Sequence, residues 1–169
     1  MIVLADSSPL IALARAQHLE LLRKFYGEVV VSRAVYEEIT ISDNGLPGAD
    51  EIRNSSWIRI ESAPSIVPAE IHTACKGLGT GERTLIWPAW SLRADLLLID
   101  EARARRVATM LGFPIAGSVA MLERGARLGH VANLQSVYLN LLRGGIYYNP
   151  KLLNQSLERL GLPLLDSEL

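Results

Sequence analysis

The chain contains several short, continuously apolar runs, each followed at once by a small polar or acidic residue. Apolar runs of this length, without alternation, are typical of strands that are buried on both faces of a parallel sheet. They therefore predict a central parallel sheet covered by helices. The runs are Ile2–Ala5 before Asp6, Val29–Val31 before Ser32, Leu96–Ile99 before Asp100, and Ile115–Ala116 before Gly117 and Ser118.

Helical patterns lie between these runs, and each is preceded by a residue type that caps helices well. Strand and helix thus alternate, and right-handed crossovers would place helices on both faces of the sheet. We expect a three-layer α/β/α sandwich whose central, mainly parallel sheet has four to five strands. The expected N-caps are Ser8, Ser32, Thr80, Asp100 and Ser118.

Two segments depart from this alternation. Residues 43–68 are rich in Asn, Gly, Pro and Ser, and predict one peripheral helix and a strand over 57–61. From Val131 onward the pattern is helical only, with a break at Gly144 and Gly145. We therefore expect a main domain over residues 1–130 and a helical C-terminal extension over 131–169 that packs on the same domain.

Composition narrows the class of protein. A chain of 169 residues can bury roughly two thirds of its unfolded surface, so it needs no disulfide or structural metal to fold. Cys75 is the only cysteine, which excludes an intramolecular disulfide and a multi-cysteine zinc site. The net charge of −1 argues against binding nucleic acid by bulk charge alone. Without a basic leader or an apolar stretch of about 18 residues, we expect a cytoplasmic protein without a membrane span.

Acidic residues occupy the positions where parallel sheets bind ligands, beyond the carboxyl ends of the strands. Asp6 and Asp100 each follow a predicted strand. Glu38 lies at the edge of the buried face of its helix, whereas the neighbouring Glu37 points to solvent. Glu82 lies on the inward face of the helix that begins near Thr80. Taken singly, each could also be a helix cap, a partner of a helix dipole or a surface charge.

Four carboxylates at one end of a sheet would repel one another unless a cation lay among them. Ligand sets made only of oxygen favour Mg²⁺ or Mn²⁺ over zinc. Such a site can activate water and offset the charge of a scissile phosphate, so it suits phosphodiester hydrolysis.

The order of these motifs resembles that of the PIN-domain nucleases, most closely the prokaryotic branch that contains the VapC-type toxins. The segment from Leu141 to Leu162 also resembles the C-terminal part of a DUF3368-type subgroup. The matching motifs are Asp6-Ser7-Ser8, Val35-Tyr36-Glu37-Glu38-Ile39, Gly79-Thr80-Gly81-Glu82, Leu98-Ile99-Asp100-Glu101-Ala102-Arg103-Ala104-Arg105, and Gly117-Ser118.

This resemblance implies a Mg²⁺- or Mn²⁺-dependent endoribonuclease, the toxin of a type II toxin–antitoxin pair. It implies an RNA substrate, a small antitoxin protein as partner, and a homodimer. Two positions depart from the common pattern: Glu101 stands where many members have a second aspartate, so its part in metal binding is open, and Pro88 interrupts a helix. The implied catalytic and metal-binding residues are Asp6, Glu38, Glu82 and Asp100, with Ser7 and Ser118 in support.

Other features leave alternatives open. Arg103, Arg105 and Arg106 form either an ordinary solvated helix face or a contact to the RNA backbone. The chain could also be a catalytically inactive PIN-like module that binds nucleic acid or protein, with the acidic pocket receiving a partner's cation. A phosphatase or phosphoacceptor is disfavoured, because no lysine occurs between Lys76 and Lys151.

Overall fold

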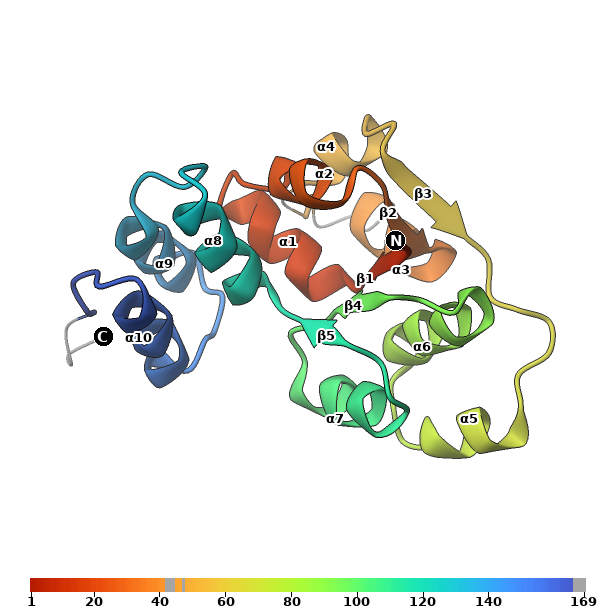
Figure 1. Ribbon diagram of the computed structural model, residues 1–169. Helices are drawn as coiled ribbons and strands as arrows, with labels where there is room; N and C mark the ends of the chain where they lie inside the picture. The colour runs from red at the N-terminus through yellow and green to blue at the C-terminus, as the bar shows by residue number, and fades with distance from the viewer. Residues whose placement is uncertain (42–44, 47, 166–169) are drawn as a thin grey trace.

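The computed structural model describes residues 1–41, 45–46 and 48–165, so part of the segment 43–68 lies outside the described residues. Within the described ranges, five strands form one parallel sheet in the order β3-β2-β1-β4-β5 (Figure 1). This confirms the predicted parallel sheet and the three-layer α/β/α class. The strands are β1 (Val3–Ala5), β2 (Val29–Ser32), β3 (Ile58–Glu61), β4 (Leu96–Leu98) and β5 (Ile115–Ala116).

The central strand explains why the apolar runs do not alternate. In β1, Val3 and Ala5 belong to one hydrophobic cluster, whereas Leu4 between them belongs to the other. Leu4 lies opposite Val30 of β2 on one side and Leu97 of β4 on the other, and all three are in the second cluster. Because both faces of the sheet are covered, every position of the strand must be apolar.

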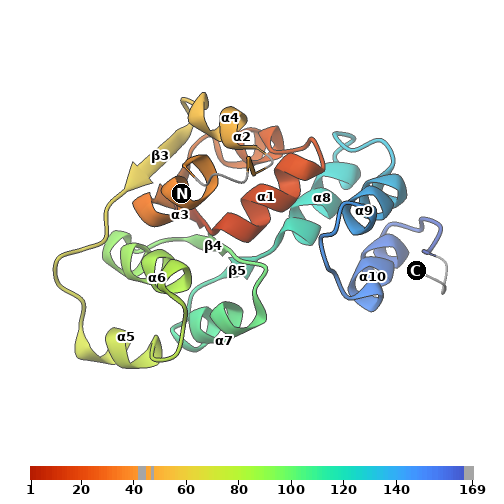
Figure 2. The same ribbon diagram turned by 180° about the vertical axis from the view of Figure 1, so that it is seen from behind.

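Helices cover the two faces as separate layers (Figures 1 and 2). One layer packs in the cluster that contains Leu4, and it consists of α5 (Ala69–Ala74), α6 (Thr80–Leu92) and α7 (Ala102–Met110). The remaining helices share the cluster that contains Val3. They are α1 (Ser7–Arg15), α2 (Glu20–Tyr26), α3 (Arg33–Thr40), α4 (Ala49–Arg53), α8 (Ser118–Arg127), α9 (Leu134–Arg143) and α10 (Pro150–Arg159).

Short local signals set several helix ends. The Ser32 hydroxyl accepts a hydrogen bond from the Val35 N–H at 3.2 Å, so Ser32 caps α3 as its sequence position indicated. Asn149 caps α10 by accepting from the Lys151 N–H at 3.0 Å, and Pro150 is the first residue of that helix. Helix α6 runs through Pro88 to Leu92 despite the missing backbone donor.

The other expected N-caps are wrong by one or two residues. The observed N-cap positions are Asp6, Gly79, Glu101 and Gly117, in place of Ser8, Thr80, Asp100 and Ser118. The case of α7 matters most, because the Glu101 carboxylate accepts the Ala104 N–H at 2.7 Å and thereby caps the helix. Asp100 is therefore not used as a cap.

The C-terminal helices pack against α8 at one end of the molecule (Figure 1). Their buried side chains, including Tyr138, Leu153 and Leu157, belong to the same hydrophobic cluster as Val3. A buried polar network joins them: the Tyr138 hydroxyl and the Ser156 hydroxyl are 2.7 Å apart, and Ser156 donates to Glu123 of α8 at 2.9 Å. In the described part of the chain, no helix is long and apolar enough to cross a membrane.

The shared cluster predicts that α10 and the sheet unfold together. Leu153 is fully buried, whereas the adjacent Leu152 is 42% exposed. We expect Leu153→Ala to lower the free energy of unfolding by about 2 to 5 kcal/mol in one cooperative transition, because it leaves a cavity in the common core. Leu152→Ala is the matched control and should change stability far less. Denaturant melts followed by far-UV circular dichroism measure both; a separate early transition in Leu153→Ala would contradict a common core.

Candidate active site

The carboxyl ends of the two central strands carry the two candidate aspartates. Asp6 directly follows β1, and Asp100 follows β4 after Ile99, so both lie at the same edge of the sheet. The Asp6 N–H donates to the Leu98 carbonyl at 3.0 Å, which ties the two strand ends together. At this edge α3 leaves β2, and the Ser32 hydroxyl lies 3.3 Å from that of Thr84 in the first turns of α6. The edge therefore joins the ends of β1, β2 and β4 to the first turns of α3 and α6.

Asp6 is the most perturbed acid of the site. Its side chain makes no capping hydrogen bond to α1, and the residue is only 4% exposed. Burial, with the charges of Glu38, Glu82 and Asp100, raises the pKa of Asp6 from 3.8 to about 6, against a hydrogen bond from the Ser7 backbone. The structure thus brings all four carboxylates named from the sequence into one electrostatic neighbourhood.

The two glutamates reach this neighbourhood from different helices. Glu38 lies in the second turn of α3 and is exposed, as is its neighbour Glu37. Glu82 lies in the first turn of α6, where its carboxylate accepts a hydrogen bond from the Gly79 N–H. A Cβ at Gly79 would come within 2.8 Å of that carboxylate, so glycine leaves room for Glu82 to fold back on the helix start.

Asp100 is held by Ser118 through both carboxylate oxygens. The Ser118 N–H donates to Oδ1 at 2.8 Å, and the Ser118 hydroxyl donates to Oδ2 at 2.7 Å. A Cβ at Gly117 would lie 2.5 Å from Oδ1, which explains a glycine in front of this serine. Burial raises the pKa of Asp100, while the bonds from Ser118 and the charge of Arg105 act in the opposite direction.

Tyr148 is a member of this cluster that the sequence did not indicate. Ser118 is fully buried, and its hydroxyl lies 2.6 Å from the hydroxyl of Tyr148, in the connection between α9 and α10. Burial, together with the charge of Asp100, raises the pKa of Tyr148, so the phenol stays protonated. The sequence offers two adjacent tyrosines after a glycine pair, without a signal for which one turns inward.

Ser7 and Glu101 lie beside the four acids. Ser7 is buried directly after Asp6. Glu101 caps α7, and its carboxylate lies near that of Glu82. Burial is the largest influence on the pKa of Glu101 and raises it, but hydrogen bonds from the Arg103 and Ala104 backbone, with the influence of Glu82 and the charge of Arg106, outweigh burial and lower the pKa. Glu101 thus adjoins the acidic cluster while serving as a cap.

The three arginines of α7 differ in their surroundings. Arg105 is half-buried and donates to the Ile99 carbonyl at 2.6 Å, so its charge is directed to the strand end beside Asp100. Arg103 is exposed and lies against Gly77. Arg106 is exposed and lines a groove between α7 and β5 with Met110. Only Arg103 and Arg106 are thus presented on the surface.

The donor set of the site fits a hard divalent cation. All four candidates offer carboxylate oxygen, and their mutual repulsion at Asp6 is the condition that a cation relieves. Across residues 1–41, 45–46 and 48–165, no three His, Cys, Asp or Glu side chains are grouped closely enough to hold a metal ion as they stand. Hydrogen bonds from Gly79 and Ser118 direct Glu82 and Asp100 individually.

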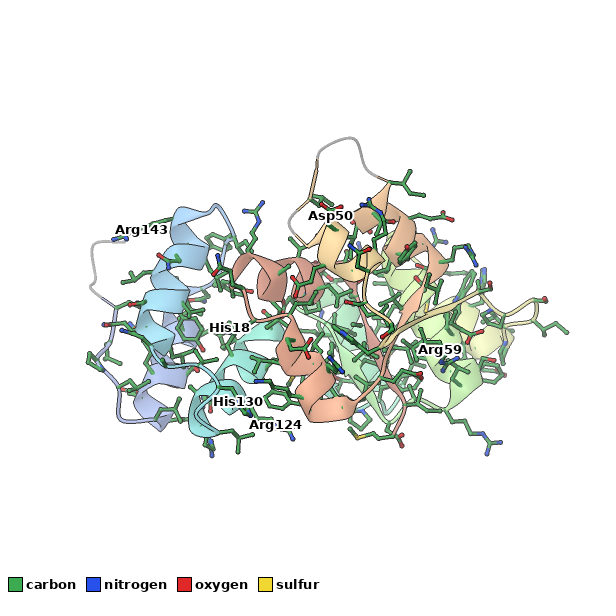
Figure 3. The ribbon with its side chains drawn as sticks, turned by 90° about the horizontal axis from the view of Figure 1, so that it is seen from above. His18, Asp50, Arg59, Arg124, His130 and Arg143 are labelled. Atoms are coloured by element: carbon green, nitrogen blue, oxygen red, sulfur yellow. The ribbon has the colours of Figure 1, made fainter. Side chains whose placement is uncertain are left out.

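Nitrogen ligands do not contribute to this edge. The ring of His130 faces that of Phe25 with centroids 6.4 Å apart, and the ring of His72 stacks on that of Trp87 at 5.9 Å. His18 and His130 lie toward the side of the molecule that carries α8 and α9, whereas Arg59 lies at the opposite end (Figure 3). The histidines are thus dispersed over the molecule.

The raised pKa of Asp6 makes a prediction for the metal-free protein. Because the pKa in the folded state, about 6, lies above the ordinary value of 3.8, this carboxyl stabilises the fold below about pH 4, and that contribution is lost as pH rises through about 6. Asp6→Asn cannot ionise, so at pH 7.5 in EDTA it should be more stable than the wild type by up to about 3 kcal/mol.

Urea melts at pH 4, 6 and 7.5 measure this difference, which should shrink toward pH 4. Glu37→Gln, which changes an exposed acid on α3, is the control and should follow the wild type at each pH. If the wild type and Asp6→Asn lose stability in parallel as the pH rises, the pKa of the Asp6 carboxyl is not raised by folding.

Comparison with known families agrees with this geometry. The model of the DUF3368 family, a PIN domain, matches residues 2–162. No curated protein and no solved structure matches the chain. PIN domains have a nuclease-type fold and typically use divalent metal ions. Because the match spans the sheet, the acidic edge and both C-terminal helices, the chain belongs to the DUF3368 family of PIN domains.

Proposed function

We propose that this protein is a Mg²⁺- or Mn²⁺-dependent endoribonuclease that hydrolyses RNA phosphodiester bonds. The observation that carries the proposal is the buried Asp6 carboxyl, which is surrounded by the charges of Glu38, Glu82 and Asp100 at the carboxyl edge of a PIN-domain sheet. A site that concentrates four acids and leaves one of them with a raised pKa is suited to hold a divalent cation.

The residues have distinct parts in this proposal. Asp6 and Asp100 are fixed to adjacent strand ends and would be the rigid ligands. Glu38 and Glu82 approach from helices and can adjust by side-chain rotation, with Glu101 beside Glu82 as a further oxygen donor. A divalent cation bound there would supply Lewis acidity to activate water and offset charge on the scissile phosphate.

The arginines of α7 support a path for RNA. Arg103 and Arg106 are exposed on α7, whose start adjoins Asp100, so they can contact phosphates of a single strand that enters the site. Arg105 has a different part, because its bond to the Ile99 carbonyl keeps the guanidinium beside Asp100. The overall charge of −1 is compatible with binding through such a local patch.

The biological setting we propose is the toxin half of a type II toxin–antitoxin pair, acting in the cytoplasm as a homodimer with a small antitoxin as partner. The support is the resemblance of the motifs to those of VapC-type toxins. A small open reading frame directly upstream, whose product co-purifies with this chain, is the observation that tests it.

Cleavage of RNA tests the enzymatic proposal directly. Wild-type protein should cut a mixed RNA substrate with Mg²⁺ or Mn²⁺ and lose activity in EDTA. Asp6→Asn and Glu38→Gln should each lose at least about 100-fold in rate, because changing even a partner of a ligand typically costs 10- to 100-fold. Glu37→Gln, on the same helix turn as Glu38, is the matched control and should retain activity.

One observation favours a second candidate, an inactive PIN-like module that binds nucleic acid or protein and whose acidic pocket receives an arginine or other cation from a partner protein. In the described portion of the chain, no three of the acids are grouped closely enough to hold a metal ion as they stand. Thermal melts separate the two, since a bound cation stabilises the folded state. A higher melting temperature with Mn²⁺ in the wild type but not in Asp6→Asn supports the nuclease; no shift and no cleavage of any RNA supports the module.

A further inference from the structure

We infer that Tyr148 is a positioning residue for Asp100, and that it acts through the hydroxyl of Ser118. The inference rests on the proposed function, in which Asp100 is a metal ligand. It links the C-terminal helices to the site, because Tyr148 lies at one end of a chain of hydrogen bonds and Asp100 lies at the other.

The chain of contacts is short and buried. The Tyr148 hydroxyl lies 2.6 Å from the Ser118 hydroxyl, which lies 2.7 Å from Asp100 Oδ2. Ser118 is fully buried and Tyr148 is 8% exposed, so water does not compete freely for either hydroxyl. The second oxygen of Asp100 is held by the Ser118 N–H at 2.8 Å. Both oxygens of the carboxylate therefore depend on where Ser118 lies.

Proton counting fixes the direction of this chain. An ionised Asp100 can only accept, so the single hydroxyl proton of Ser118 must be donated to Asp100. The Ser118 oxygen then has only lone pairs to offer to Tyr148, and Tyr148 must be the donor. The phenol thus orients the serine hydroxyl toward the carboxylate, which favours the rotamer in which Asp100 faces the site.

The placement of Tyr148 depends on the packing of the C-terminal helices. Tyr148 precedes Asn149, the N-cap of α10, and α10 is anchored by the fully buried Leu153 and Leu157. Its neighbour Tyr147 is 88% exposed. The turn before them contains Gly145 at φ +82°, a backbone conformation that residues with a side chain rarely adopt. This turn directs the following residues back toward α8.

The chain offers two matched control tyrosines. Tyr138 is also fully buried in the C-terminal helices, but its hydroxyl pairs with Ser156 rather than with Ser118. Tyr138→Phe therefore removes a buried phenol hydroxyl without touching the site. Tyr147→Phe removes an exposed hydroxyl from the residue next to Tyr148. A general effect of losing a tyrosine hydroxyl would be seen in Tyr138→Phe as well.

The test is Mn²⁺ affinity, measured by calorimetric titration of the full-length protein. Tyr148→Phe should weaken Mn²⁺ binding by about threefold to tenfold, somewhat less than the 10- to 100-fold typical of direct partners of ligands. Tyr138→Phe and Tyr147→Phe should bind like the wild type, even where the former lowers the melting temperature. In RNA cleavage, Tyr148→Phe should need more Mn²⁺ for half-maximal rate, with an unchanged KM for RNA.

A double-mutant cycle with Ser118→Ala tests the path. If Tyr148 acts through Ser118, Tyr148→Phe should have no further effect on Mn²⁺ affinity in the Ser118→Ala background. Full additivity of the two changes would overturn the path. If Tyr148→Phe binds Mn²⁺ as tightly as a wild type that cleaves RNA, the inference is overturned but the proposed nuclease function stands. Absence of Mn²⁺ binding and of RNA cleavage in the wild type would overturn the proposed function, and with it this inference.

Discussion

The burial of the Asp6 carboxyl at the end of the central strand is the constraint on which the site depends. A parallel sheet with both faces covered places the residue after β1 in a nearly dry position, and this chain puts an acid there. Burial, together with the charges of three further acids, raises its pKa to about 6. The fold therefore holds an unfavourable concentration of negative charge, which a bound divalent cation would convert into a favourable one.

Asp6 and Asp100 meet this constraint in different ways. Asp100 receives two hydrogen bonds from Ser118 and lies beside the Arg105 guanidinium, whose own position is fixed by the Ile99 carbonyl. For Asp6 the opposing influence is a backbone hydrogen bond from Ser7. Within the part of the chain that the structure describes, the protein thus supplies positive charge beside Asp100 but not beside Asp6. Asp6 is therefore the carboxylate that depends most on a bound cation.

The sequence predicted the layers and the acidic edge because both follow from local patterns. Uninterrupted apolar runs indicate strands covered on both faces. An acid directly after such a run lies at the carboxyl edge of the sheet, independently of the loop conformations. The helix starts were less predictable, because Asp100 and Glu101 are adjacent and both can cap. Which one caps depends on Ser118, which binds Asp100 from 18 residues away. Tyr148 was not predictable at all, since its role depends on the three-dimensional path of a turn.

Helix α8 connects the two parts of the chain. Its first residue, Ser118, holds Asp100, and Glu123 in its next turn accepts hydrogen bonds from Ser156 and Arg159 of α10. The Arg159 side chain, together with Ser156, holds the pKa of Glu123 below its ordinary value, so this buried acid stays ionised and bound to α10. Tyr148 lies two residues before α10 begins, and its hydroxyl contacts Ser118. Helices α8 and α10 are thus joined by polar contacts at two places. Helix α8 therefore sets both the docking of α10 and the orientation of Asp100.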